Sequence, residues 1–248
     1  MNLNQIATIE AIDISYGFSN SKTNQKMISD ITLSIFPGEF TLITGDLGSG
    51  KSTLLAMISG LLHLDRGKIL IAEHELGKLN NCELDRFHSI NCGFIFQRIN
   101  LSNELTVLDN LLLSLSCGIM TSCQESIAKA TKALNIVGLK HKKDVYPKEL
   151  RDSERQRVAI ARAIVNSPRY LFTDEPTCYL DKYDCQTAID ILSFIARHQR
   201  GTVVVASQDN RLIKHADRII TLKEGKIIHD THFTYSIMNK TMSLYEDN

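Results

Sequence analysis

The chain has 248 residues, of which 43% are hydrophobic and 23% charged, and this is typical of a globular protein with one large or two small domains. Basic and acidic residues both number 28, so the zero net charge excludes a bulk attraction to nucleic acid or anionic lipid and leaves only a local basic patch open. The six cysteines lack C-x-x-C and zinc-finger spacing, which indicates free thiols in a reducing compartment.

The amino-terminal residues MNLNQIATIE have neither the basic nor the apolar region of a secretory signal. The most apolar run, LLLSLSCGIM at Leu111 to Met120, is too short to span a bilayer. We therefore expect a soluble chain that reaches a membrane only through a partner.

The first clear pattern along the chain is a strand, a loop and a helix. FTLITG at Phe40 to Gly45 is short, rich in β-formers and ends in glycine, and KSTLLAMISGLL at Lys51 to Leu62 has a helical pattern. From about Asn100 to Asn166, the runs LTVLDNLLLSL and ESIAKATKALNIVGL have apolar residues three and four apart, which predicts a helical insertion.

The remaining apolar runs predict strands. YLFTD at Tyr170 to Asp174 and TVVVAS at Thr202 to Ser207 are continuously apolar, as buried parallel strands are. RIITLKEGKIIHD at Arg218 to Asp230 predicts two strands joined around Glu224 and Gly225, and the residues from Ser236 are polar enough for a loosely held tail. An α/β fold with a mostly parallel core sheet follows.

The loop after the first strand carries a phosphate-binding pattern. GDLGSGKS at Gly45 to Ser52 fits G-x-x-x-x-G-K-[ST] between a predicted strand and a predicted helix. Glycines let consecutive N–H groups surround phosphates at the positive end of a helix, Lys51 would reach the β- and γ-phosphates, and Ser52 would bind Mg²⁺. The alternative is a glycine-rich turn that fits by chance. The predicted ATP-binding residues are Gly45, Asp46, Leu47, Gly48, Ser49, Gly50, Lys51, Ser52 and Thr53.

LFTDE at Leu171 to Glu175 supplies acidic groups at the carboxyl end of a buried strand. Asp174 would hold Mg²⁺ directly or through water, and Glu175 would polarise the attacking water. Taken alone, such a pair is usually a solvated turn or a helix cap. Together with Lys51 and Ser52, it predicts a nucleotide-hydrolysing site.

In this order, these motifs resemble the nucleotide-binding subunits of ABC transporters, and the resemblance covers nearly the whole chain. It also rests on GFIFQRINLSNELTVLDNL at Gly93 to Leu111, RQRVAIARAIVNSP at Arg155 to Pro168, TDEPT at Thr173 to Thr177 and YLD at Tyr179 to Asp181. The chain looks most like the branch of lipoprotein-release, macrolide-export and cell-division ATPases.

The resemblance implies one ABC-type P-loop domain over residues 1–248. Its nucleotide-binding core would comprise residues 1–97 and 167–235, including an antiparallel β portion near the amino terminus. The helical subdomain would comprise residues 98–166 and the tail residues 236–248.

The resemblance also implies roles for single residues. Gln97 would contact Mg²⁺ and sense a transmembrane partner, and Asp181 would lie in the loop that crosses to the opposite subunit. Tyr16 would stack on adenine, with a half-buried strand tyrosine as the alternative. The family further implies a head-to-tail homodimer or heterodimer that sandwiches two ATP molecules. This chain would be cytoplasmic, bound to a transmembrane permease subunit at the cytoplasmic face of the inner (plasma) membrane.

The chain departs from the family at the signature, Leu-Ser-Gly-Gly followed by Gln or Glu. Its aligned residues are Leu150, Arg151, Asp152, Ser153 and Glu154, of which the last four are the predicted nucleotide contacts across the dimer. Asp152 is expected to cap its own helix and to repel the γ-phosphate. The Arg151 guanidinium offers a compensating charge in an unfavourable geometry.

A second departure is Gln208 in SQD, where the family places histidine. Glutamine donates a hydrogen bond to a γ-phosphate but lacks the positive charge that stabilises the transition state. His215 is expected to be a surface residue rather than a replacement. Glu175 and Gln208 are the predicted catalytic residues.

The sequence therefore predicts an ATP- and Mg²⁺-binding subunit of an ABC transport complex that hydrolyses ATP slowly. The alternatives are a catalytically weak regulatory or scaffolding subunit of a membrane complex, and tolerance of both changes in a competent ATPase. A cassette acting on DNA or ribosomes is disfavoured because this short, neutral chain lacks a second cassette or a basic surface, so we expect no nucleic-acid partner. The substrate and the direction of transport stay open.

Overall fold

The structure is a computed structural model that describes residues 8–17, 26–117, 122–199 and 201–233. The tail expected at residues 236–248 lies outside the described residues. Where helices are described, none is long and apolar enough to cross a membrane.

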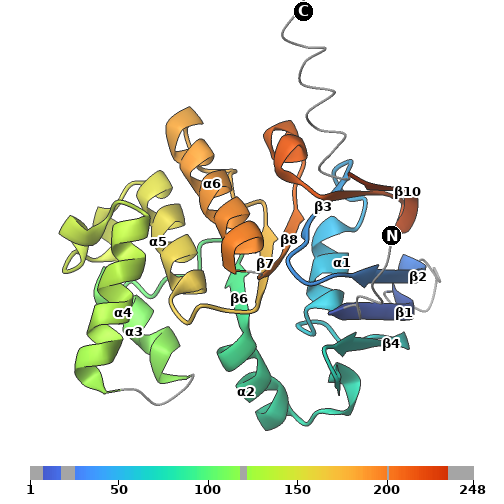
Figure 1. Cartoon of the computed structure of the whole chain (residues 1–248), viewed down its shortest axis with the longest axis horizontal. Helices are drawn as coiled ribbons and strands as arrows, with labels where there is room; N and C mark the ends of the chain where they lie inside the picture. Colours follow the sequence, from blue (N-terminus) through green and yellow to red (C-terminus); the bar gives the residue numbers. More distant parts are fainter. Residues whose placement is uncertain (1–7, 18–25, 118–121, 200, 234–248) are drawn as a thin grey trace, which may run out of the picture.

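The central sheet is mostly parallel, with strand order β10-β9-β3-β8-β7-β6, and only β10 runs antiparallel to its neighbour (Figure 1). The strands are β3 (Phe40–Gly45), β6 (Cys92–Ile95), β7 (Tyr170–Asp174), β8 (Thr202–Ala206), β9 (Arg218–Lys223) and β10 (Lys226–His232). The predictions for β3, β7, β8 and the β9–β10 pair are confirmed. The α/β class with a mostly parallel core sheet is also confirmed.

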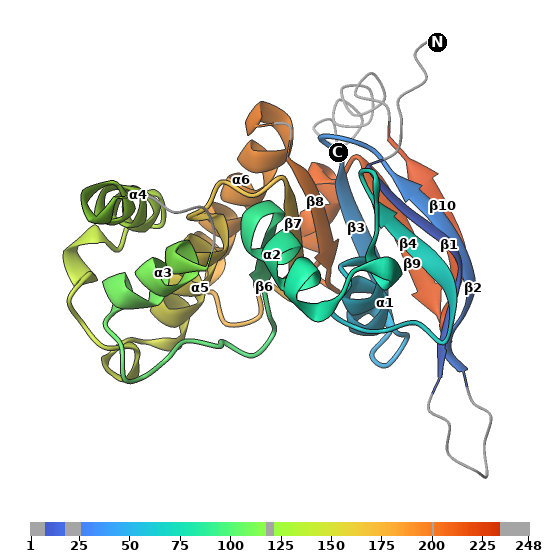
Figure 2. The ribbon, with the colours of Figure 1, turned by 90° about the horizontal axis from the view of Figure 1, so that it is seen from below.

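A second sheet is antiparallel, with strand order β2-β1-β4-β5. It comprises β1 (Ile9–Gly17), β2 (Lys26–Ile35), β4 (Arg66–Ile71) and β5 (His74–Glu75). This is the antiparallel portion that the family resemblance implied. Figure 2 shows helix α1 (Lys51–Ile58) between this sheet and the central sheet.

Helix α1 is shorter than the predicted run to Leu62. Gly60 adopts a left-handed backbone with φ 77°, and its N–H donates to the carbonyl of Met57. The N–H of Leu61 donates to the carbonyl of Ala56, so the helix ends in a C-terminal cap that depends on glycine. The glycine therefore ends the helix inside an apolar run that fits the helical period.

Helices α3, α4, α5 and α6 pack on the face of the central sheet opposite α1, and α3, α4 and α5 lie at one end of the molecule (Figure 1). Helix α2 packs on the same face as α1 through Phe87. The helices are α2 (Asn81–Asn91), α3 (Val107–Ser116), α4 (Cys123–Ile136), α5 (Asp152–Ile164) and α6 (Lys182–Gln199). Short 3-10 turns complete the chain: η1 (Leu76–Lys78), η2 (Lys140–Lys142), η3 (Pro147–Glu149) and η4 (Asn210–His215). The predicted helical insertion is therefore present.

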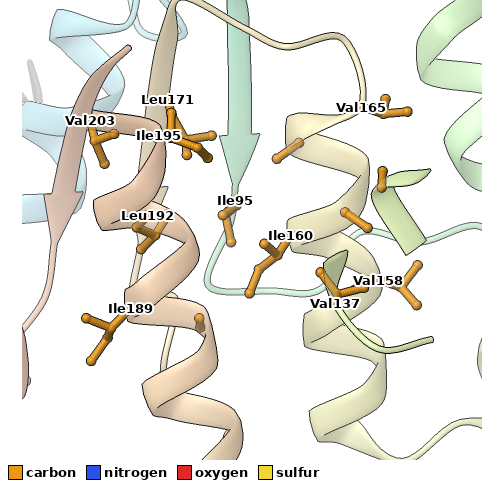
Figure 3. Close-up of a cluster of buried hydrophobic side chains, with 14 of the residues drawn as sticks. Ile95, Val137, Val158, Ile160, Val165, Leu171, Ile189, Leu192, Ile195 and Val203 are labelled. Carbon is orange, nitrogen blue, oxygen red and sulfur yellow. The ribbon is translucent and has the colours of Figure 1, made fainter. Parts of the chain in front are cut away.

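Two hydrophobic cores lie on the two faces of the central sheet. One joins the sheet to α3, α4, α5 and α6, and the close-up in Figure 3 shows Ile160 of α5 and Leu192 of α6 within it. The other joins the sheet to α1 and the antiparallel strands, and includes Leu54 and Ile220. The strand ends that carry the predicted site are held between these two cores.

Candidate functional site

The loop between β3 and α1 requires glycine at two positions. Gly45 and Gly50 have φ angles of 144° and 103°. A Cβ would lie 2.1 Å from the carbonyl oxygen of Leu222 at Gly45, and 2.8 Å from the Cδ1 atom of Ile28 at Gly50. At Gly48, with φ 77°, a Cβ would meet no atom within 4 Å, so this part of the loop faces open space.

The Lys51 side chain is folded back over this loop. Lys51 is only 7% exposed, and its Nζ atom donates to the carbonyl oxygens of Gly45 and Asp46, both at 2.9 Å. Ser49 is buried, with a hydroxyl that has no partner within the described part of the chain, whereas Leu47 is 93% exposed. A cationic group and the free N–H groups of the first turn of α1 thus meet at one open loop, as anion binding requires.

Thr53, the last residue of the predicted cradle, faces the antiparallel sheet. Its hydroxyl donates to the sulfur of Met27 at 3.7 Å, and Met27 belongs to β2. This contact ties the start of α1 to the antiparallel sheet rather than to the loop.

Ser52 and Asp174 are brought together from positions 122 residues apart. The Ser52 hydroxyl donates to Oδ1 of Asp174 at 2.9 Å. Burial raises the pKa of the Asp174 carboxyl, the Ser52 hydrogen bond opposes this effect, and the neighbouring Glu175 adds to it. A hydroxyl and a half-buried carboxylate are hard oxygen donors, so the pair fits Mg²⁺ chemically.

Glu175 is fixed by its backbone and by its carboxylate. Its φ angle of 46° is unusual for a residue with a side chain, and its N–H donates to the carbonyl of Ala206 at 2.9 Å. Oε2 accepts a hydrogen bond from the Ser207 hydroxyl at 2.6 Å, and Oε1 accepts one from the N–H of Gln208 at 3.2 Å. The carboxylate beside the cradle is therefore held by the loop that follows β8.

The Gln208 side chain lies at the cradle itself. Its Nε2 atom donates to the carbonyl oxygen of Gly45 at 3.2 Å, and Lys51 donates to the same oxygen. His215 lies elsewhere, half-buried, with Nδ1 3.2 Å from the hydroxyl of Ser193 on α6. Burial lowers the pKa of His215. His215 is thus less exposed than the sequence suggested, and it does not replace Gln208 at the cradle.

A set of contacts next to Gln208 was not foreseen. Asp209 accepts a hydrogen bond from the buried Thr177 at 2.8 Å and pairs with Arg211 through both carboxylate oxygens. Burial disfavours the Asp209 carboxylate, but these hydrogen bonds outweigh it and lower its pKa to about 2. The Thr177–Asp209 hydrogen bond links the TDEPT segment to the loop that carries Gln208.

The start of α5 differs from the expectation that Asp152 caps the helix. Asp152 is the first helical residue, and its carboxylate pairs with the guanidinium of Arg155 one turn later. Glu154 instead accepts the N–H of Arg151 at 3.1 Å and pairs with Lys142. The capping prediction was wrong because the third residue of the turn is a glutamate that reaches back to the preceding N–H.

The charges at this helix start are therefore unequally exposed. Arg151 and Asp152 are exposed, whereas the Glu154 side chain is 13% exposed. The hydrogen bond from Lys142 lowers the pKa of Glu154 against the opposing effect of burial. Glu154 is thus tied to its own subunit, and Arg151, Asp152 and the partly buried Ser153 are left at the surface.

Three predicted residues lie outside the hydrogen-bonded group. Gln97 is exposed just beyond β6, and no hydrogen bond connects it to Ser52 or Asp174 among the residues described. Tyr16 is half-buried in β1, opposite Ile28 of β2. Asp181 is exposed and caps α6, because its Oδ1 atom accepts the N–H groups of two following residues at 2.9 and 2.8 Å.

The site residues that the sequence analysis missed are Ser207, Thr177, Asp209 and Arg211. Ser207 directly follows a strand that is buried along its whole length, and a polar residue at such a strand end is a signal for a site. No comparable signal marks the Thr177–Asp209 contact, which joins residues 32 positions apart.

A parallel sheet whose strand ends bring together a glycine loop, a buried lysine and a Ser–Asp pair defines a P-loop nucleotide-binding protein. The family model described as ABC transporter matches residues 28–178. The chain therefore belongs to the ABC transporter family, and it is an ATP-binding, ATPase-class component of a transport complex.

Several known proteins are similar to the chain. The lipoprotein-releasing system ATP-binding protein LolD of Buchnera aphidicola is 35% identical over 92% of this chain and 99% of its own length. The bacitracin export ATP-binding protein BceA of Halalkalibacterium halodurans is 33% identical over 92% of this chain and 89% of its own length. The macrolide export ATP-binding/permease protein MacB of Pasteurella multocida is 34% identical over 94% of this chain, which spans only 36% of that protein.

Among solved structures, the ATP-binding cassette MJ0796 matches with a TM-score of 0.87 and 29% identity, over 91% of this chain and 99% of that one. That structure is a dimer in a post-hydrolysis state bound to ADP and Pi. The ABC-type cassette fold is thus confirmed. Cassettes of this family dimerise and work with permease partners.

Proposed function

We propose that the chain binds ATP with Mg²⁺ in the cradle from Gly45 to Thr53 and couples ATP binding and slow hydrolysis to a transmembrane permease. The observation that carries this proposal is the 2.9 Å hydrogen bond between Ser52 and Asp174 beside the buried Lys51. It brings together, at the carboxyl ends of the parallel strands, the side chains that would bind phosphate and those that would bind the cation. Residues 98–166 would form the helical subdomain of a single cassette.

Within this proposal, each residue has a distinct role. Lys51 binds the β- and γ-phosphates, while Ser52, Asp174 and Gln97 hold the cation. Mg²⁺, when bound, neutralises charge on the phosphate oxygens. Glu175 positions the attacking water and accepts its proton, and Gln208 turns its amide from Gly45 toward the γ-phosphate.

The remaining predicted residues are proposed to serve adenine and the opposite subunit. Tyr16 stacks on adenine, and the partner's nucleotide faces Arg151, Asp152, Ser153, Glu154 and Asp181. The support for slow turnover is that Asp152 puts a carboxylate, which pairs with Arg155 of its own helix, where the family has a glycine. The subunit would lie on the cytoplasmic face of the plasma membrane, as part of a homodimer or a heterodimer.

ATP binding is tested by titration of the isolated chain with a fluorescent ATP analogue. Lys51→Ala should weaken binding about 10- to 100-fold, because it removes a charged donor to the phosphates. Lys140→Ala, at an exposed lysine of η2, is the control and should bind like wild type. Equal affinity for wild type and Lys51→Ala would reject the cradle.

A second candidate function is supported by the changed signature and Gln208. In this reading ATP occupancy alone is the signal, and the chain is a regulatory or scaffolding subunit of a membrane complex. Turnover measured with and without the permease separates the two. Stimulation by the permease favours the transport ATPase, and ATP binding without stimulated turnover favours the regulatory subunit.

A further inference from the structure

Ser207 is placed between the two strands that build the site. It directly follows β8, which lies between β3 and β7 in the central sheet. The residue is fully buried, and its N–H donates to the carbonyl of Ile43 on β3 at 3.0 Å. Its hydroxyl is therefore fixed relative to the strand that leads to the cradle and to the strand that carries Asp174.

The direction of the hydrogen bonds at the Ser207 hydroxyl is determined. The Oγ atom accepts the N–H of Asp209 at 3.1 Å and lies 2.6 Å from Oε2 of Glu175. A hydroxyl has a single proton, and a carboxylate only accepts. The Ser207 proton therefore points at Glu175, in a short bond of the charge-assisted kind.

The second carboxylate oxygen of Glu175 is held by the N–H of Gln208 at 3.2 Å. Two donors on two different oxygens fix the plane of the carboxylate. Glu175 also has a left-handed backbone, with φ 46°, which is unusual for a residue with a side chain. Orientation of this kind matters because a misplacement of about 1 Å costs about 100-fold in rate.

We propose that Ser207 is a positioning residue for hydrolysis, whose hydroxyl holds the Glu175 carboxylate in the orientation that a water-activating base needs. The proposal rests on the proposed function of the site. Ser207 is 0% exposed, so it acts through Glu175 rather than by touching substrate. Its loss should lower kcat about tenfold or more and leave the affinity for ATP unchanged.

The variants are Ser207→Ala, which removes the hydroxyl, and Ser207→Thr, which keeps it. Thr41 provides a matched control, because it is fully buried and its hydroxyl donates to the Glu39 carboxylate, also at 2.6 Å, near the opposite end of β3. Thr41→Val removes an equivalent bond away from the cradle. The readouts are kcat and ATP affinity, with thermal stability to verify folding.

A second readout uses the ATP-free protein. Urea unfolding is measured for wild type, Ser207→Ala, Glu175→Ala and the double variant. Ser207→Ala should raise the unfolding equilibrium constant about tenfold when Glu175 is present and by a clearly smaller factor when Glu175 is absent, because the bond from the Asp209 N–H is lost in both backgrounds. This double-mutant cycle measures the coupling between Ser207 and Glu175, and it does so even if ATP turnover is too slow to measure.

The proposal is supported if Ser207→Ala lowers kcat at constant affinity, Ser207→Thr restores it, Thr41→Val retains wild-type kcat, and the unfolding cycle is non-additive. It is overturned if Ser207→Ala turns over like wild type while Glu175→Gln does not, or if the cycle is additive. Failure of the proposed function gives a different result, because the wild-type chain then binds no ATP. In that case the unfolding cycle still tests whether Ser207 and Glu175 are coupled.

Discussion

Glu175 has a backbone conformation that costs stability and a carboxylate that two donors hold. Strain of this kind persists where the surrounding structure over-determines it, and it concentrates at functional sites. Asp174, one residue earlier, has a regular strand backbone and bonds to Ser52 instead. The two neighbouring carboxylates therefore face different partners, as a cation ligand and a base require.

Glu175→Gln should lower kcat about 100-fold or more and leave ATP affinity nearly unchanged. The amide keeps the shape of the side chain but accepts no proton, so the change destabilises the transition state and leaves the bound ground state nearly unaffected. Single-turnover rates and a nucleotide titration measure the two quantities. Glu149→Gln, at an exposed glutamate of η3, is the control. Turnover of Glu175→Gln at the wild-type rate would mean that Glu175 is not the base.

Asp209 should contribute stability that depends on pH. Its folded pKa of about 2 lies below its unfolded pKa of about 4, so the contribution is complete above about pH 4 and is lost as the pH falls toward 2. Asp209→Asn removes the titrating group and should make the free energy of unfolding less dependent on pH in this range. Urea unfolding between pH 6 and pH 2.5 measures the effect, and parallel pH profiles for the two proteins would reject it.

Local spacing was enough to predict the glycine loop and the TDE run as a candidate site, because each is a contiguous motif at the end of a strand. The sequence did not reveal how Glu175 is oriented. Its partners Ser207 and Gln208 lie 32 and 33 positions away, and only the packing of β8 beside β7 brings them together. Such contacts depend on tertiary structure and carry no local pattern.

Elements were predictable where their residue pattern was strong. The strands β7 and β8 were predicted from continuous apolar runs, and β3 from a short run of β-formers that ends in glycine. Helix α2 was not predicted, although Asn80 and Glu83 form a reciprocal capping box that was present in the sequence. Strand β6 was also missed, because a run of four residues is too short for its periodicity to stand out.

Arg218 joins several elements of the fold. It is 4% exposed, its Nε and Nη2 atoms donate to the Asp230 carboxylate of β10 at 2.7 and 2.6 Å, and Nη1 donates to the carbonyl of Ser34 on β2. Glu39 lies 3.7 Å from the same guanidinium. The central sheet and the antiparallel sheet are therefore connected through one buried cation.

Arg218→Met should destabilise the protein by about 3 kcal/mol, because it leaves the buried Glu39 carboxylate and the partly exposed Asp230 carboxylate without their cation. Arg66→Met is the control, since Arg66 pairs with Asp30 at 3.6 Å with both side chains more than half exposed. That change should cost less than about 1 kcal/mol. Denaturant unfolding compares the two, and equal losses would contradict the role assigned to Arg218.

The two cores hold the proposed cradle and the changed signature at separate places on one subunit, at the starts of α1 and α5. In the head-to-tail dimer that we propose, each ATP lies between one subunit's cradle and the other subunit's signature. A homodimer would combine Gln208 and Asp152 in both sites. A heterodimer with an intact partner would divide them between two sites, and neither arrangement leaves a site with the usual family residues.

We propose that this chain binds ATP well but hydrolyses it slowly, because Asp152 and Gln208 both remove favourable charge from the γ-phosphate. Two repairs follow: Arg151→Ser, Asp152→Gly and Ser153→Gly together restore the signature, and Gln208→His restores the switch. Each should raise turnover about tenfold if it returns about 1.4 kcal/mol of transition-state stabilisation, and the two effects should couple because both act on one phosphate.

The most direct test is the steady-state ATPase rate of wild type, each repair and their combination, assembled with the native permease. We expect a slow wild type, an increase with each repair and the highest rate for the combination, at equal ATP affinity. A wild-type rate already typical of an active transporter, or a combined repair that leaves a slow rate unchanged, would contradict the claim.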